Sequence, residues 1–215
     1  MQRSPIAIGE VIRHGVIFDL KNWTDHPMNS DDLALSVARL FALLDERRID
    51  FTLVGGVALL QYIEGRNTQD LDLLLALPSL DRVPEIDVIE HDNDFARGEF
   101  GGLRIDFLLA QNPFFAHIRS THTTWQPFAE QVIRTATVEG LILLKLYALP
   151  SLYRQGNFAR VGLYENDIAT LLHTYRPDMA AILNELDSFL DKGDLKEVRG
   201  IVEELKGRFA RFGKA

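Results

Sequence analysis

The chain has 215 residues, of which 47% are hydrophobic and 25% charged, and these values predict one globular domain or a small domain with a helical appendage. The formal net charge of -8 argues against a protein that coats nucleic acid without selectivity, although a local basic cluster could still bind a nucleotide or RNA. The absence of cysteine excludes disulfides, thiolate nucleophiles and cysteine-ligated zinc, and it is typical of a cytoplasmic protein.

Residues 1–30 show no clear hydrophobic periodicity, and we interpret them as an irregular arm with one short strand near Val16 to Phe18. Ser30, followed by two aspartates, is typical of the start of a helix, where a capping side chain precedes acids at the positive end of the dipole. Apolar residues then recur at helical spacing as far as Leu44, which predicts an amphipathic helix.

The segment from Asp50 to Leu109 predicts strands and turns. Its expected elements are a buried strand over 51–54, a tight turn at Gly55 and Gly56, a helix over 57–63, a strand over 70–75, and a hairpin of 95–100 with 103–109. From Thr137 the pattern is helical, with helices expected near 137–149, 165–175, 178–190 and 195–212.

These elements predict an α+β fold, in which a small mixed sheet flanked by helices is followed by a C-terminal helical bundle. We expect three parts: an N-terminal arm over 1–30, a core over 31–130, and a C-terminal helical subdomain over 131–215.

Asp70 and Asp72 flank Leu71 in the second predicted strand. Because side chains two residues apart on a strand point to the same face, the two carboxylates project together. Their mutual repulsion would be relieved by a divalent cation that prefers oxygen ligands, such as Mg2+ or Mn2+. The alternative is a solvent-facing edge strand whose acids only make the protein soluble, and this short motif alone does not decide between the two.

Asp106 stands among branched and aromatic residues in the last strand of the predicted hairpin. If that strand lies beside the strand of Asp70 and Asp72, a third carboxylate joins the same patch. Three carboxylates can bridge two metal ions, or hold one ion while the third removes a proton from an attacking hydroxyl. The alternative is that an arginine, such as Arg104 or Arg66, neutralises Asp106.

Gly55 and Gly56 lie where the first strand is expected to pass into a helix. Glycines allow the backbone to approach a ligand closely, and a helix N-terminus offers free N–H groups to phosphate. The alternative is a tight turn that only requires a positive φ.

Lys145 lies in a segment, Gly140 to Leu149, that is apolar on every side of the expected helix. Such a helix is buried, and a buried ammonium group is costly unless it is paired. Either the side chain reaches the surface along its stem, or it meets anions such as a triphosphate in a cleft.

The same lysine interrupts the longest apolar run of the sequence, so no membrane span is predicted. Nothing near the N-terminus predicts a secretory signal.

Together these residues resemble the signature of a known family. The run Val54-Gly55-Gly56, a helix, the segment from Thr68 to Leu74, and then Ile105-Asp106 resemble the polymerase-beta-like nucleotidyltransferases. The spacing and the downstream helix around Lys145 are most similar to the AbiEii-type branch, the toxin components of type IV toxin–antitoxin systems. The resemblance covers roughly residues 50–172.

The resemblance implies a nucleotidyltransferase fold and a transferase that moves a nucleoside monophosphate from an NTP to an acceptor hydroxyl, with pyrophosphate leaving. Asp70 and Asp72 would bind Mg2+ or Mn2+, and Asp106 would complete the metal site and act as the base. Gly55 and Gly56 would cradle the phosphates.

Two further residues belong to the expected nucleotide site. The resemblance implies that Lys145 reaches the triphosphate, and Arg66 is a candidate for nucleotide or acceptor contacts because it lies just before the acidic strand. The chain departs from the AbiEii-type pattern before Asp167, where residues 161–164 replace an expected Lys-Asp pair.

The implied acceptor is an RNA end, such as that of tRNA, or a protein side chain, and an AbiEii-type toxin would also have an antitoxin partner. Two alternatives stay open. One is an antibiotic-modifying nucleotidyltransferase similar to the aminoglycoside and lincosamide enzymes, and the other is a non-catalytic nucleotide-binding protein of the same fold.

Overall fold

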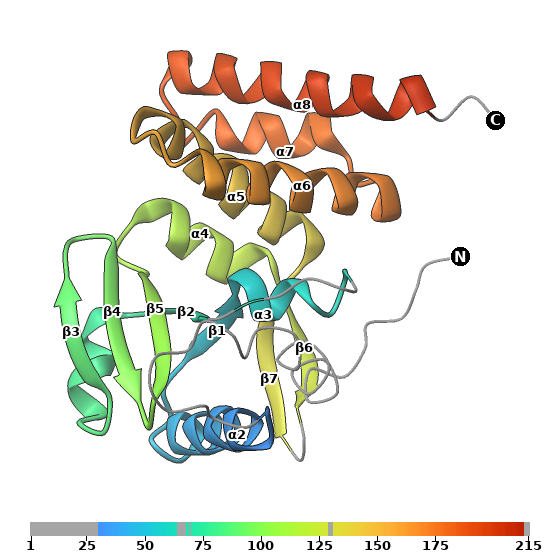
Figure 1. Ribbon diagram of the computed structural model, residues 1–215. Helices are drawn as coiled ribbons and strands as arrows, with labels where there is room; N and C mark the ends of the chain where they lie inside the picture. The colour runs from blue at the N-terminus through green and yellow to red at the C-terminus, as the bar shows by residue number, and fades with distance from the viewer. Residues whose placement is uncertain (1–29, 64–67, 69, 129–130, 213–215) are drawn as a thin grey trace. The chain divides into compact units, whose positions relative to one another are not determined.

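The computed structural model describes residues 30–63, 68, 70–128 and 131–212 of the chain. They divide between two compact units, a sheet-containing unit that ends at Thr137 and a helical unit that begins at Val138 (Figure 1). The predicted N-terminal arm, with its short strand near Val16 to Phe18, lies outside the described residues, as does Arg66.

A mixed sheet forms the first unit (Figure 1). Its strands are β1 (Phe51–Val54), β2 (Leu71–Leu75), β3 (Asp87–His91), β4 (Phe95–Phe100), β5 (Leu103–Leu109), β6 (Thr123–Phe128) and β7 (Gln131–Ala136). The strand order is β3-β4-β5-β2-β1-β7-β6. The β2–β5 and β1–β7 pairs are parallel and the other neighbours are antiparallel, which confirms the predicted mixed sheet.

Helices flank this sheet, as the sequence predicted. They are α2 (Ser30–Glu46), α3 (Gly55–Leu59), the 3-10 helix η1 (Leu77–Arg82) and α4 (Pro113–Thr121). Phe41 of α2 is fully buried, stacks on Phe51 of β1 at 5.2 Å between ring centroids, and meets Phe128 of β6 edge-on at 4.9 Å. These aromatic contacts anchor α2 on two strands of the sheet.

Helix α4 was not predicted, although its start carries a clear signal. The Asn112 side chain accepts hydrogen bonds from the backbone N–H groups of Phe114 and Phe115, and Pro113 occupies the first turn. An asparagine cap followed by proline is a strong start for a helix, because the side chain satisfies free N–H groups and proline has none to lose.

Burial along β5 alternates strictly, so its two faces differ. Leu103, Ile105, Phe107 and Leu109 are buried, whereas the residues between them face outward or are half-buried. On the neighbouring strand β4, Ala96 and Gly98 are buried and the alternate positions are exposed. The sheet therefore has one core face and one open face in this region, and the open face carries Arg104 and Asp106.

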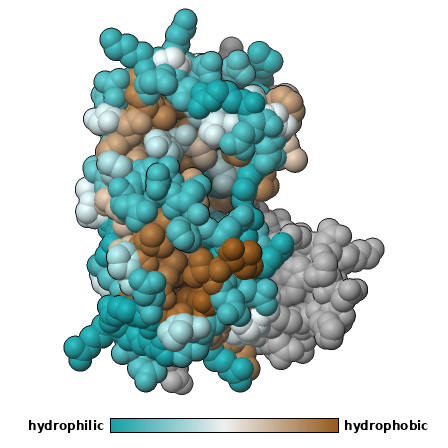
Figure 2. Space-filling model, turned by 90° about the vertical axis from the view of Figure 1, so that its left-hand side faces the viewer, coloured by the Kyte–Doolittle hydropathy of each residue, from teal (hydrophilic) through white to brown (hydrophobic). Residues whose placement is uncertain are grey.

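Strand β3 forms one edge of the described sheet, and all five of its residues are exposed. Figure 2 views the molecule from the side on which β3 and β4 lie in Figure 1, and it shows hydrophobic side chains gathered among hydrophilic ones. The exposed apolar residues of these strands are Val88, Ile89 and Phe95. A register shift between Val88 and Glu90 interrupts the ladder, and such an irregularity hinders pairing with another edge.

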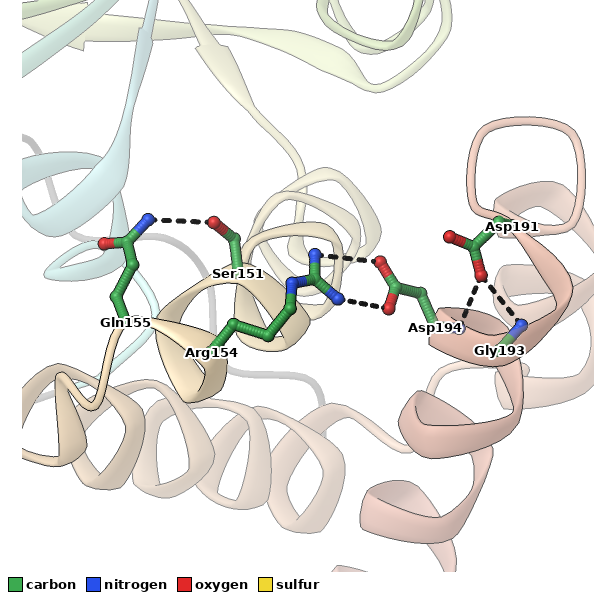
Figure 3. A network of polar contacts seen from close by, with 6 residues as sticks. All are labelled: Ser151, Arg154, Gln155, Asp191, Gly193 and Asp194. Atoms are coloured by element: carbon green, nitrogen blue, oxygen red, sulfur yellow. Dashed lines mark hydrogen bonds and ion pairs between the residues drawn. The ribbon is translucent and has the colours of Figure 1, made fainter.

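The helical unit consists of α5 (Val138–Arg154), α6 (Phe158–Tyr175), α7 (Met179–Leu186) and α8 (Lys192–Phe212). The Asp191 carboxylate accepts hydrogen bonds from the backbone N–H groups of Gly193 and Asp194 at the start of α8, and Arg154 holds the Asp194 carboxylate with two nitrogens (Figure 3). These contacts join α5 to α8. None of the helices in the described ranges combines the length and apolar character that a membrane span needs.

The four C-terminal helices confirm the predicted helical part, with different bounds. Helix α5 continues through Pro150 to Arg154, and α6 begins at Phe158, capped by Asn157, rather than at Glu165. Helix α7 ends at Leu186 rather than near 190. Strand β7, over 131–136, pairs with β1 and therefore belongs to the sheet-containing unit.

Candidate active site

Asp72 and Asp106 lie side by side on the open face of the sheet. The parallel register of β2 and β5 pairs Leu71 with Ile105, Asp72 with Asp106 and Leu73 with Phe107. Directly paired residues of adjacent strands point to the same face, so the two carboxylates project together while the leucine and phenylalanine side chains enter the core. The structure thus brings together two of the three predicted acids.

Asp70 immediately precedes β2 and joins the same patch. Its Oδ1 lies 3.2 Å from Nε of Arg104, a residue two positions before Asp106 on β5. Its negative charge also contributes to the raised pKa of Arg97, whose guanidinium group contacts Asp106. Asp70 therefore lies beside Arg104 of β5, the strand that also carries Asp106.

The glycine turn closes directly against Asp72. Gly55 has a φ of +62°, and the backbone N–H of Gly56 donates a hydrogen bond to Asp72 Oδ2 at 3.1 Å. A Cβ atom at Gly55 would lie 2.0 Å from the same oxygen, so no side chain fits there. The turn thus has the positive φ expected of glycine, and it also allows the backbone to approach an acidic side chain very closely.

Arg97 of β4 links Asp106 to a further acid. Its Nε donates to Asp106 Oδ1 at 3.0 Å, and its second nitrogen, Nη1, donates to Glu90 Oε1 of β3 at 2.6 Å. The hydrogen bond and charge of Asp106, together with the charges of Glu90 and Asp70, raise the pKa of Arg97. A row of alternating charges, Glu90, Arg97 and Asp106, therefore crosses three adjacent strands to reach Asp72.

The three aspartates fit a divalent cation by the chemistry of their donors. Carboxylate oxygens are the ligands that Mg2+ and Mn2+ prefer, and neighbouring strands are only about 4.8 Å apart, so paired aspartates can reach one ion. Among the residues that the structure describes, the oxygens of Asp70, Asp72 and Asp106 do not all lie within 4.8 Å of one another. Arg104 holds Asp70 and Arg97 holds Asp106, each through one carboxylate oxygen. An ion shared by all three acids requires their carboxylates to draw closer together.

Lys145 lies in the helical unit and forms a buried ion pair. Its Nζ is 2.9 Å from Asp167 Oδ2, and the two side chains are 6% and 1% exposed. The Nζ also lies 4.1 Å from the centroid of the Tyr164 ring, which adds a cation–π contact. The sequence predicted either a lysine that reaches the surface or one that meets anions in a cleft, and the anion that it contacts is Asp167.

Arg97 and Glu90 were missed by the sequence interpretation, although one of them had a signal. The turn at Gly101 and Gly102 sets a hairpin register in which Phe100 pairs with Leu103, and counting back along both strands pairs Arg97 with Asp106. One alternative from the sequence was that an arginine neutralises Asp106. The arginine that pairs with Asp106 is Arg97, whereas Arg104 pairs with Asp70. Glu90 could not be placed in this way, because the register of β3 shifts between Val88 and Glu90.

No family model matches the chain, and no curated protein sequence matches it. Among solved structures, an antigenic nucleotidyltransferase-like protein from Paracoccidioides brasiliensis is similar, with 18% identity and a TM-score of 0.59. The alignment covers 86% of this chain and 94% of that one. At this identity the likeness shows the fold alone, and it confirms the predicted nucleotidyltransferase-like fold.

Two structures of the antibiotic-resistance factor ANT(2'')-Ia align less closely. The solution structure is 16% identical over 86% of this chain and 97% of that one, with a TM-score of 0.45. The complex with adenylyl-2''-tobramycin is 13% identical over 80% of this chain and 96% of that one, also with a TM-score of 0.45. Similarity at this level carries no argument about the acceptor of the present protein.

Proposed function

We propose that this protein is a metal-dependent nucleotidyltransferase, which moves a nucleoside monophosphate from an NTP to an acceptor hydroxyl. The observation that carries the proposal is the pairing of Asp72 with Asp106 on the open face of a nucleotidyltransferase-like fold, with a glycine turn closed against Asp72. Asp70, directly before β2, contacts Arg104 of β5. A solubility role alone does not explain acids that are only partly exposed and matched in register.

Asp70, Asp72 and Asp106 are the residues proposed to hold Mg2+ or Mn2+. A bound divalent ion would neutralise charge on the triphosphate and on the acids themselves. The Gly55–Gly56 turn is the proposed phosphate contact, because neither residue carries a side chain, the turn lies directly against the proposed metal ligand Asp72, and it opens α3. Helix α3 is short, so the turn would act through its close approach rather than through a helix dipole.

The proposed reaction needs one base and one leaving group. The acceptor oxygen forms a bond to the α-phosphorus, and the bond from that phosphorus to the oxygen bridging to the β-phosphate breaks, so that pyrophosphate leaves with the bond electrons. The proton of the acceptor hydroxyl passes to a carboxylate oxygen of Asp106. Positioning and charge neutralisation by the fixed carboxylates would supply most of the rate enhancement.

The finer assignments are extensions of this proposal. An AbiEii-type toxin, with a tRNA end or protein side chain as acceptor and an antitoxin as partner, rests on the sequence resemblance. Arg66 stays a proposed nucleotide contact that lies outside the described residues. Lys145 stays a proposed contact of the triphosphate. Because the ion pair with Asp167 already satisfies the buried ammonium group, the triphosphate would have to share Lys145 with Asp167 or displace Asp167.

The acceptor can be found by following the transferred label. The protein is incubated with each α-labelled NTP, Mg2+ or Mn2+, and separately total RNA, cell protein, or aminoglycoside and lincosamide antibiotics. We expect label to enter one of these acceptors only when the metal is present. Absence of transfer to every acceptor, together with absence of nucleotide binding by calorimetry, would contradict the proposed function and favour a non-catalytic protein of the same fold.

A further inference from the structure

We propose that Arg97 is a positioning residue, which holds one oxygen of Asp106 so that the other faces Asp72 and the metal. This inference rests on the proposed function, because it assigns Arg97 a role in the same metal site. Arg97 is not among the residues that the sequence resemblance implicates.

The position of Arg97 in the sheet carries the argument. Strand β5 lies between β4 and β2, so Asp106 has Arg97 on one side and Asp72 on the other. Arg97 donates to Oδ1 from the β4 side. The other oxygen, Oδ2, would then bind a metal ion shared with Asp72 of β2. A carboxylate that binds a metal is commonly held by such a hydrogen bond from outside the ligand set, because the bond fixes its orientation.

Glu90 gives the guanidinium group of Arg97 a second carboxylate partner, on β3. The guanidinium group spans two carboxylates, with Nη1 at 2.6 Å from Glu90 and Nε at 3.0 Å from Asp106. The three residues are matched across β3, β4 and β5 by the strand register. Because both ends of the guanidinium group are held, Arg97 can fix the orientation of Asp106 although its own side chain is half exposed.

The direction in which removal of the Arg97 charge changes the affinity for a divalent cation separates this role from a general charge effect. Removing a positive charge near an acidic site should strengthen cation binding if Arg97 acts only through its charge. Loss of the orienting hydrogen bond should weaken cation binding, and outer-shell partners of this kind are worth about 10- to 100-fold in metal affinity. The two explanations therefore predict changes in opposite directions.

The test is a calorimetric titration of the full chain with Mn2+. Arg97→Gln is expected to raise the Kd for Mn2+ about tenfold, and Arg97→Lys, which keeps the charge but cannot bridge both carboxylates, to raise it by a smaller factor. Arg134→Gln is the matched control: it removes the same charge from β7 of this sheet, where Arg134 pairs with Asp50, and it should not weaken binding. Circular dichroism melting curves establish that each variant is folded.

A double-mutant cycle distinguishes positioning from a structural effect. In an Asp106→Asn background, Arg97→Gln should add little to the loss of Mn2+ affinity, because the carboxylate that it orients is gone. A full-sized effect in that background, or an unchanged or lower Kd for Arg97→Gln alone, would overturn the inference while leaving the metal site intact. If Mn2+ does not bind the wild-type protein, or binds the Asp106→Asn variant equally well, the proposed metal site fails and this inference fails with it.

Discussion

Gly55 and Asp72 are so close that no residue with a Cβ atom fits at position 55. A Cβ atom at Gly55 would lie 2.0 Å from Asp72 Oδ2 and 2.2 Å from its Cγ, and the glycine also has a φ of +62°. The adjacent Gly56 N–H donates to the same oxygen. The end of β1 and the acid of β2 are therefore one structural unit, in which the turn positions the carboxylate.

Gly55→Ala should consequently displace Asp72 and weaken the metal site. The matched control is Gly101→Ala, because Gly101 has a similar φ of +55° but no atoms close enough to meet a new side chain. Both substitutions incur the strain of a positive φ, about 1–2 kcal/mol, and Gly55→Ala should destabilise the protein by about 1–3 kcal/mol more through overlap. Urea denaturation measures this difference. Equal destabilisation by the two substitutions, with Mn2+ affinity unchanged by Gly55→Ala, would contradict the proposed support of Asp72.

Breaking the buried Lys145–Asp167 pair should destabilise the helical unit. Lys145→Met leaves the Asp167 carboxylate buried without its cation, which costs about 3–5 kcal/mol, whereas Lys145→Met combined with Asp167→Leu should recover much of this loss. Arg154→Gln, which breaks the exposed pair with Asp194, serves as the control and should change stability little. Urea denaturation followed by circular dichroism provides the measurement. A double variant as unstable as the sum of its single variants would argue against coupling between the two side chains.

Tyr153 should titrate late and make stability depend on alkaline pH. Its hydroxyl donates to Glu165, and this hydrogen bond, followed by burial and nearby negative charge, raises the pKa of Tyr153 from 10.0 to about 12. The folded state thus favours the neutral phenol, so the stabilisation is fully present below the unfolded pKa and is lost as the pH rises from 10.0 to about 12. The difference in tyrosinate absorbance between wild type and Tyr153→Phe should have its midpoint near the upper value. A midpoint near the lower value would show that the phenol is not held by Glu165.

Local patterns were sufficient to predict the strands that carry the site. The buried run Phe51–Val54 is β1, and the hairpin of β4 and β5 has the predicted bounds because Gly101 and Gly102 set its turn. The lateral pairing of Asp72 with Asp106 could not be derived from spacing, because no local signal states which strands are neighbours in a sheet. It was expected only on the condition that the two strands were adjacent.

Other elements were missed for identifiable reasons. Strands β6 and β7 lack a clear apolar alternation, since β6 contains Pro127 and polar residues and β7 has Arg134 near its centre. Asp167 is distant in sequence from Lys145, so the ion pair depends on the packing of α5 against α6, which the helical periodicity does not reveal. The start of α4, in contrast, carries a local signal, because Asn112 caps the helix and Pro113 follows it.

The most direct test of the account is metal-dependent NTP turnover by Asp72→Asn and Asp106→Asn. Glu203→Gln is the control, because it removes an exposed acid of α8 that pairs with Lys206 of the same helix and is not part of the proposed metal site. We predict that each aspartate substitution lowers turnover about 100-fold or more while the protein stays folded, since both carboxylates are needed to position and neutralise the triphosphate. Wild-type turnover by both aspartate variants would contradict the claim that Asp72 and Asp106 share one catalytic metal site.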